Sequence, residues 1–162
     1  LPRQFEDDNN FSLICDEATE RCSVIKDFLI KNKLSDSIHL MNITSKKSDL
    51  PIIKEIASEL EQNFDTIVII GTGGSMLSGN TYSYLVPSKK IRFLYSVDPI
   101  SFKNFFAEIN LGKTGFLVIS KSGKTVETIS LSLASINLLK ENNIEIKNNF
   151  IFITDPNDNP IR

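Results

Sequence analysis

The sequence has little of several residue types on which common protein classes depend. It has no tryptophan, one histidine (His39) and two cysteines, Cys15 and Cys22. If the stretch between the cysteines is helical, their Cα atoms lie about 10.5 Å apart along the axis. A disulfide needs Cα atoms within about 7 Å. We therefore expect free thiols in a reducing compartment and, with one histidine, no metal site.

Neither sign of charge dominates, and no apolar run is long. The chain has 18 Lys+Arg against 20 Asp+Glu, which gives a net charge of −2. This balance lacks the basic surplus of a nucleic-acid-binding surface. Apolar runs such as residues 66–70 are far shorter than the roughly 20 residues of a membrane helix, and we recognise no signal peptide. We expect a cytoplasmic protein with neither nucleic acid nor membrane as a partner.

The length of 162 residues suits one globular domain, since domains commonly have roughly 100–200 residues. Residues 1–48 form a predicted helical arm, because apolar residues recur at helical spacing over 11–33 and a polar linker follows. Residues 49–162 form the predicted α/β domain, and its first helix opens at Pro51. Because the chain starts at Leu1 and ends at Arg162, we expect a piece of a longer protein.

Strands and helices alternate after residue 65. This alternation predicts a parallel sheet built from βαβ units. The predicted strands are 66–70, 91–96, 116–120 and 149–154, and the helices between them are 75–85, 99–109 and 125–142. For the strand order 2-1-3-4, ligands bind beyond the carboxyl ends of strands one and three, where the strand order reverses.

The loops after those two strands carry the candidate chemistry. The first loop, residues 71–75, contains Gly73, Gly74 and Ser75. The second loop combines hydroxyls, a glycine and positive charges: Ser120, Lys121, Ser122, Gly123, Lys124 and Thr125. Glycines let a ligand approach the backbone, and free amides at a helix N-terminus favour an anion. These two loops predict a phosphate site.

Other interpretations of the loops remain open at this point. They could be only tight strand-to-helix turns, although two such loops at one switch point favour a ligand. Glu127 could stabilise the start of its helix or face the ligand. Nucleotide binding is weakly supported: Met76 replaces the third glycine of the dinucleotide fingerprint, and both Gly-Lys-Thr triplets lack the upstream glycine of a P-loop.

Residues 70–75 and 120–128 resemble two segments of the phosphoglucose isomerase family, and 97–99 and 154–156 resemble two more. The resemblance implies a sugar isomerase (SIS) domain, which is a three-layer α/β/α sandwich with a parallel, flavodoxin-like sheet of five strands. It implies that residues 120–125 grip the phosphate of glucose 6-phosphate or fructose 6-phosphate, while Gly74 and Ser75 line the sugar side. It also implies that Glu127 supports the acid–base residues. Lys124 departs from the usual threonine.

The resemblance further implies a homodimeric aldose–ketose isomerase of glycolysis and gluconeogenesis that needs neither metal nor cofactor. The family's ring-opening histidine and its base glutamate have no matching positions in these 162 residues. We therefore expect the chain to bind sugar phosphate but to be inactive alone. Two alternatives remain: a stand-alone sugar-phosphate sensor without catalysis, and an isomerase or lyase of another SIS family.

Overall fold

The computed structural model describes residues 8–32 and 47–162, and it separates into two compact units, residues 1–52 and 53–162. Helix α1 (Asp8–Asn32) belongs to the first unit. It confirms the predicted N-terminal helix and starts three residues earlier than expected. Cys15 and Cys22 are free thiols on it, and both are exposed. His39 and most of the predicted linker lie outside the described residues.

Helix α3 (Leu50–Asn63) confirms the predicted helix with Pro51 in its first turn. Of the four apolar residues at helical spacing on one face of this helix, Leu60 is buried, while Ile52, Ile53 and Ile56 are exposed. The next residue with a packing role is Phe64, whose ring lies directly against Gly115; a Cβ on this glycine would come within 2.7 Å of the ring. From Ile53 onward α3 belongs to the second unit, in which Leu60 and Phe64 pack.

The second unit contains a four-stranded sheet in the order β2-β1-β3-β4. Its strands are β1 (Thr66–Ile70), β2 (Ile91–Leu94), β3 (Thr114–Ile119) and β4 (Phe150–Ile153). All neighbouring pairs are parallel. The predicted strand order and direction are confirmed, so β1 and β3 are neighbours and their carboxyl ends meet at the point where the strand order reverses.

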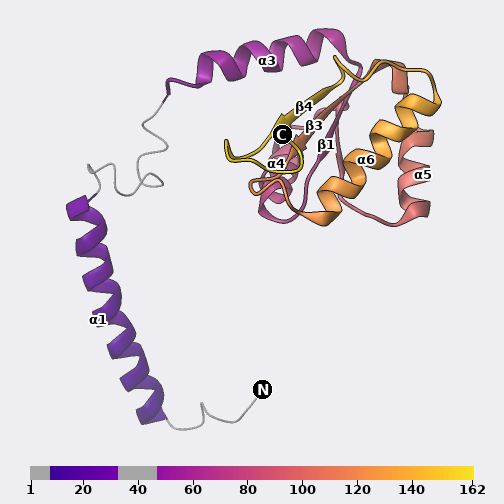
Figure 1. The fold of residues 1–162 in the computed structure, drawn as a ribbon. Coiled ribbons are helices and arrows are strands. Elements are labelled where there is room, and N and C mark those ends of the chain that lie inside the picture. The colour runs from indigo at the N-terminus through magenta and orange to yellow at the C-terminus, as the bar shows by residue number, and fades with distance from the viewer. Residues whose placement is uncertain (1–7, 33–46) are drawn as a thin grey trace. The chain divides into compact units, whose positions relative to one another are not determined.

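Three helices connect the strands: α4 (Gly74–Leu85), α5 (Pro99–Ala107) and α6 (Val126–Glu141). A short 3₁₀ turn, Leu111–Lys113, precedes β3. Figure 1 shows α5 and α6 together beside one face of the sheet. Gly79 of α4 contacts the ring of Phe93, which points away from that face. The helices therefore cover both faces, as a three-layer α/β/α fold requires.

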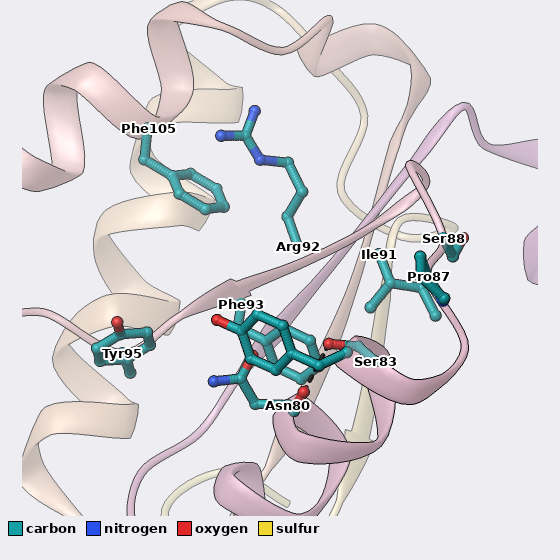
Figure 2. A pocket seen from close by; sticks show the side chains of 10 residues that line it. Asn80, Ser83, Pro87, Ser88, Ile91, Arg92, Phe93, Tyr95 and Phe105 are labelled. Atoms are coloured by element: carbon teal, nitrogen blue, oxygen red, sulfur yellow. Dashed lines mark hydrogen bonds between the residues drawn. The ribbon is translucent and has the colours of Figure 1, made fainter.

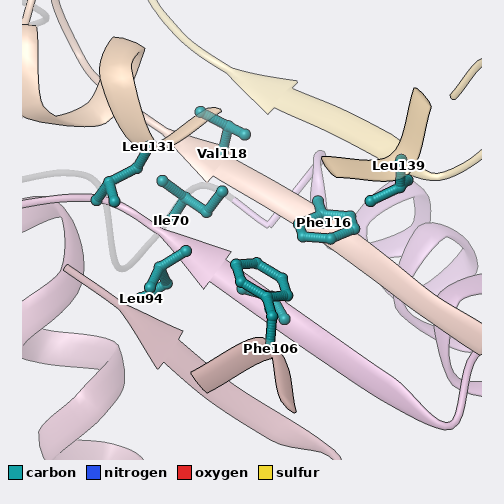
Figure 3. Close-up of a cluster of buried hydrophobic side chains, with 8 residues drawn as sticks. Ile70, Leu94, Phe106, Phe116, Val118, Leu131 and Leu139 are labelled. Atoms are coloured by element: carbon teal, nitrogen blue, oxygen red, sulfur yellow. The ribbon is translucent and has the colours of Figure 1, made fainter. Parts of the chain in front are cut away.

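The core lies between the sheet and the pair α5 and α6. Figure 3 shows how this face is filled by side chains from three strands and both helices. Its buried members are Val68, Ile70, Leu94, Phe106, Phe116, Val118, Leu131 and Leu139. Phe116 also stacks on Phe150 of β4, with ring centroids 4.5 Å apart. Fully burying one such side chain stabilises the fold by about 1.5–3 kcal/mol, so this face contributes most of the hydrophobic stabilisation.

The opposite face is less completely covered. The continuous apolar run of residues 66–70 is typical of a strand buried on both faces, but this strand is fully buried only on the α5 and α6 side. Val68 and Ile70 are fully buried there, while Ile67 and Ile69, which point toward α4, are half-buried. The described residues hold four strands, compared with the five that the family resemblance implies.

Candidate functional site

The two predicted loops lie next to each other because β1 and β3 are paired in the sheet. Ile70 is aligned with Val118 in the register, so both strands end at nearly the same level. A Cβ on Gly71 would come within 3.1 Å of the carbonyl oxygen of Ile119. The loops that follow these strands, residues 71–75 and 120–125, therefore form one continuous rim at the switch point of the sheet.

The loop before α6 brings two of its predicted hydroxyls together. The Ser120 hydroxyl donates a hydrogen bond to the Thr125 hydroxyl at 3.3 Å. Ser120 is only 3% exposed, and Thr125 is half-buried at the N-cap of α6. The Ser122 hydroxyl instead accepts a hydrogen bond from the backbone N–H of Lys124 at 3.2 Å. Ser120 and Thr125 thus form a hydroxyl pair, while Ser122 helps to shape the loop.

The starts of α4 and α6 leave their first backbone amides without a side-chain cap. Gly73 is the N-cap of α4 and Thr125 that of α6, and neither makes a capping hydrogen bond through its side chain. The first N–H groups of a helix have no partner within the helix. They carry the positive end of the helix dipole and bind anions readily. Two uncapped helices therefore begin on one rim.

Helix α5, which follows the edge strand β2, begins differently. The carboxylate of Asp98 accepts a hydrogen bond from the backbone N–H of Ser101 at 2.7 Å. This hydrogen bond lowers the pKa of Asp98 below its ordinary value. The start of α5 is thus capped by its own chain, as the Asp-Pro sequence predicts, and it offers less to an external anion.

Part of the chain is similar to known proteins. No protein-family model matches the chain. A glucose-6-phosphate isomerase of Desulfotalea psychrophila is 35% identical over 114 residues, which are 65% of this chain and 21% of that protein. A probable glucose-6-phosphate isomerase of Methanococcus maripaludis is 36% identical over 107 residues, covering 60% of this chain and 24% of that protein.

Solved structures agree with these sequence matches. The crystal structure of a glucose-6-phosphate isomerase from Chlamydia trachomatis matches with a TM-score of 0.64 and 28% identity, over 68% of this chain and 22% of that one. The chain is a homologue of the glucose-6-phosphate isomerases. A hypothetical protein from Thermus thermophilus matches with a TM-score of 0.69 over 91% of this chain and 37% of its own, and at 22% identity it supports the fold alone.

The sequence-based resemblance to this family is confirmed. The matched part spans about a fifth of the length of these curated glucose-6-phosphate isomerases. The matches therefore concern a limited part of the relatives, and they leave the role of each rim residue in this chain as a prediction.

The remaining predicted site residues of this chain lie on the rim and differ in exposure. Gly73 and Gly74 are exposed and Ser75 is half-buried. In the second loop, Gly123 is buried while the other members are exposed: Lys121, Ser122 and Lys124. Glu127 is exposed in the first turn of α6. Its carboxylate can favour the helix dipole or face a bound ligand, as the sequence already allowed.

A hollow away from the rim has the wrong chemistry for an anion. This hollow of about 420 Å³ lies beside the edge strand β2, and Tyr84 is among its lining residues. Figure 2 shows the lining residues Tyr95 and Phe105. Its only cation, Arg92, already forms an ion pair with Glu108 at 2.7 Å. The guanidinium also lies 4.8 Å from the centre of the Phe105 ring. We therefore place the candidate anion site at the rim and not in this hollow.

Sequence reasoning missed two residues beside the rim. Asn159 packs against Gly123, although many residues separate the two in the chain. Thr128 is 1% exposed, and its hydroxyl has no hydrogen-bond partner among the described residues. Thr128 lies in the segment 120–128 that carries the family resemblance, but no role was assigned to it there, and no local motif marks Asn159. The only available signal was the position of Thr128 one turn into the helix that follows the second loop.

No helix within residues 8–32 and 47–162 has both the length and the apolar character needed to cross a membrane. The same residues contain no cluster of three or more His, Cys, Asp or Glu side chains that could hold a metal ion.

Proposed function

We propose that the rim binds the phosphate group of glucose 6-phosphate and fructose 6-phosphate, as part of an aldose–ketose isomerase. The observation that carries this proposal is the pair of uncapped helices, α4 and α6, starting from adjacent loops. The hydroxyls of Ser120 and Thr125 add donors at the same place. Amides, hydroxyls and a helix dipole together provide the charge-assisted hydrogen bonds that a phosphate dianion prefers.

In this proposal, each loop contacts a different part of the ligand. Residues 120–125 hold the phosphate, with Lys121 and Lys124 supplying positive charge. Gly73, Gly74 and Ser75 of the first loop lie on the sugar side, where exposed glycines let the sugar approach the backbone. Glu127 supports acid–base groups. The homology to glucose-6-phosphate isomerases supports this substrate class.

Catalysis needs more than this rim. Moving a proton between C1 and C2 of the sugar requires an acid and a base within hydrogen-bond reach. Phosphate binding alone gives affinity to substrate and transition state alike, and so it does not raise turnover. We propose that the remaining catalytic groups lie outside these 162 residues. The complete enzyme is then a cytoplasmic homodimer, as the resemblance implies, and this chain alone binds without turnover.

Titration of the purified chain with inorganic phosphate and with glucose 6-phosphate, followed by NMR, tests the rim. Ser120→Ala and Thr125→Ala each remove a donor to a charged group, which is worth about 1.5–3 kcal/mol. We expect affinity to fall about tenfold or more. Ser130→Ala, on an exposed position of α6, is the control and leaves affinity unchanged. Unchanged affinity in both rim variants would refute the assignment.

A second assay tests the division between binding and catalysis. The chain is incubated with fructose 6-phosphate, and glucose 6-phosphate is measured. We expect no product above the uncatalysed background. Measurable isomerisation by the purified chain contradicts the proposal that the main acid–base groups lie elsewhere, while leaving the phosphate assignment intact.

A further inference from the structure

The segment that follows β4 folds back onto the second loop of the rim. The backbone N–H of Asp155 and the hydroxyl of Thr154 both donate to the carbonyl oxygen of Lys121, at 3.0 and 3.4 Å. The N–H of Ser120 donates to the carbonyl of Ile153 at 3.0 Å. Residues 154–162 are therefore attached to the loop through its backbone, leaving the hydroxyls of Ser120 and Thr125 to each other.

Asn159 is the residue of this segment whose side chain is fixed at both ends. Its Nδ2 donates to the carbonyl oxygens of Asp155 at 3.2 Å and Asn157 at 2.8 Å. Its Oδ1 accepts from the backbone N–H of Ile161 at 3.2 Å. Because one end meets two acceptors and the other a donor, the hydrogen bonds define which end carries the nitrogen. The side-chain amide thus has one orientation.

This fixed amide lies directly on Gly123. A Cβ on Gly123 would overlap the Oδ1 and Cγ atoms of Asn159. Gly123 has a φ of 62°, in the left-handed region that favours glycine. Its N–H donates to the carbonyl of Ser120 at 3.2 Å, which closes the turn. Asn159 therefore lies against Gly123, the positive-φ residue of the turn that leads into α6.

The first loop of the rim provides an internal comparison. Gly73 has a similar φ of 55°, but a Cβ on it would meet nothing within 4 Å. Both glycines therefore have a positive φ, and only Gly123 has a neighbour that confines it. The contact with Asn159 is thus specific to the loop that carries the hydroxyl pair.

We propose that Asn159 is a positioning residue for the phosphate site, which rests on the function proposed above. By confining Gly123, it keeps the turn in the conformation that places the Ser120 and Thr125 hydroxyls 3.3 Å apart at the uncapped start of α6. A preorganised site binds more tightly because less freedom is lost on binding. Asn159 itself does not touch the ligand in this proposal.

The test compares Asn159→Ala with Asn157→Ala, an exposed asparagine in the same segment. The complete 162-residue chain is titrated with inorganic phosphate. We expect Asn159→Ala to weaken phosphate binding about three- to tenfold and to shift the NMR signal of the Gly123 amide before any phosphate is added. Asn157→Ala changes neither. Wild-type affinity and an unshifted Gly123 signal in Asn159→Ala would overturn the proposal.

Ser120→Ala and Thr125→Ala, measured in the same titration, separate the two proposals. If they weaken binding and Asn159→Ala does not, only the positioning role fails. If none of the three weakens binding, the phosphate site itself is wrong.

Coupling between Asn159 and Gly123 gives a readout that a general stabilising role would not affect. Gly123→Ala meets both backbone strain and the Asn159 side chain. In the Asn159→Ala background only the strain remains, so Gly123→Ala lowers the urea midpoint by less than it does with Asn159 present. Equal losses in the two backgrounds would contradict the contact. If Asn159→Ala does not fold, Asn159→Ser carries the same comparison with a smaller change.

Discussion

The turns before α5 and α6 show two different ways to begin a helix. At α5, the carboxylate of Asp98 accepts from the N–H of Ser101 at 2.7 Å, so the chain satisfies its own amide. At α6, Thr125 makes no side-chain cap, and its hydroxyl is instead 3.3 Å from that of Ser120. The turn before α5 therefore needs no ligand to satisfy this amide. The turn before α6 is held by the segment after β4, and its backbone amides remain available to a ligand.

This difference shows that a helix start can serve stability or binding. A side-chain cap stabilises the helix by satisfying a free donor. An uncapped start forgoes that stabilisation, but its donors and dipole remain available to an anion. Since α4 and α6 share the uncapped arrangement and follow adjacent strands, the sheet gathers two binding-competent starts, while the capped α5 follows the edge strand.

The largest expected effect distinguishes the confined glycine from the open one. Gly123→Ala adds the clash with Asn159 to the strain of a positive φ, so we expect a loss of about 2–4 kcal/mol in the free energy of unfolding. Gly73→Ala has only the strain, and we expect about 1–3 kcal/mol. Urea denaturation measures both. Equal losses of stability in the two variants would show that the Asn159 side chain moves aside without destabilising the fold.

The next prediction compares the loss of stability with the loss of phosphate affinity when each helix start is altered. Asp98→Ala removes the cap of α5, so it lowers the urea midpoint and leaves phosphate affinity unchanged. Thr125→Ala does the reverse: phosphate affinity falls about tenfold or more, and the midpoint changes less than in Asp98→Ala. A Thr125→Ala variant that loses stability but keeps its phosphate affinity would remove the distinction between the two turns.

The pH dependence of stability sharpens the description of the capped turn. The N–H of Ser101 stabilises ionised Asp98, so its pKa is lower in the folded chain than in the unfolded chain. The cap's contribution is therefore complete above the unfolded pKa of about 3.9 and is lost as the pH falls through the folded pKa.

Asp98→Asn keeps a capping oxygen that does not titrate. We expect a smaller decrease in its urea midpoint between pH 5 and the acid limit than in the wild type, with a lower midpoint than the wild type at pH 7 and similar midpoints at the acid limit. Identical pH profiles for the two chains would argue against a contribution from Asp98.

The smallest effect concerns the lysines of the uncapped turn. Lys121 and Lys124 are exposed, and exposed charge pairs contribute about 0.2–1 kcal/mol. Lys121→Met and Lys124→Met therefore weaken phosphate binding by a factor of about 1.4 to 5 at low salt, and the difference shrinks at high salt because the charges are screened. Lys140→Met, in the last turn of α6, is the control. A salt-independent loss would point to a packing role.

Local patterns were enough to predict most of the fold. Residues 66–70 form the predicted strand because a β-branched run favours an extended backbone, and the structure gives the same bounds. Strand β3 begins earlier than predicted, at Thr114, because Thr114 and Gly115 pair with Thr66 and Ile67 in the sheet. That extension depends on the neighbouring strand and not on the propensity of a glycine.

The candidate site was predictable in composition but not in arrangement. The sequence identified the two loops and their hydroxyls, since glycine and serine at a strand-to-helix junction indicate an anion site without reference to distant residues. It did not separate Ser122, which bonds the Lys124 amide, from the paired Ser120 and Thr125. It gave no indication of Asn159, because a single asparagine in a polar segment has no periodic pattern.

The sequence by itself determined the alternation of strands and helices and the two candidate loops that follow the first and third strands. These features follow from backbone propensity, hydrophobic periodicity and the topology of parallel connections, all of which act over short stretches of chain. Only the tertiary structure decided which hydroxyls meet, which helix starts remain uncapped and which glycine is confined. Those outcomes depend on contacts between segments far apart in the chain, such as Asn159 on Gly123 and Gly71 beside Ile119, and such contacts form only when the sheet has assembled.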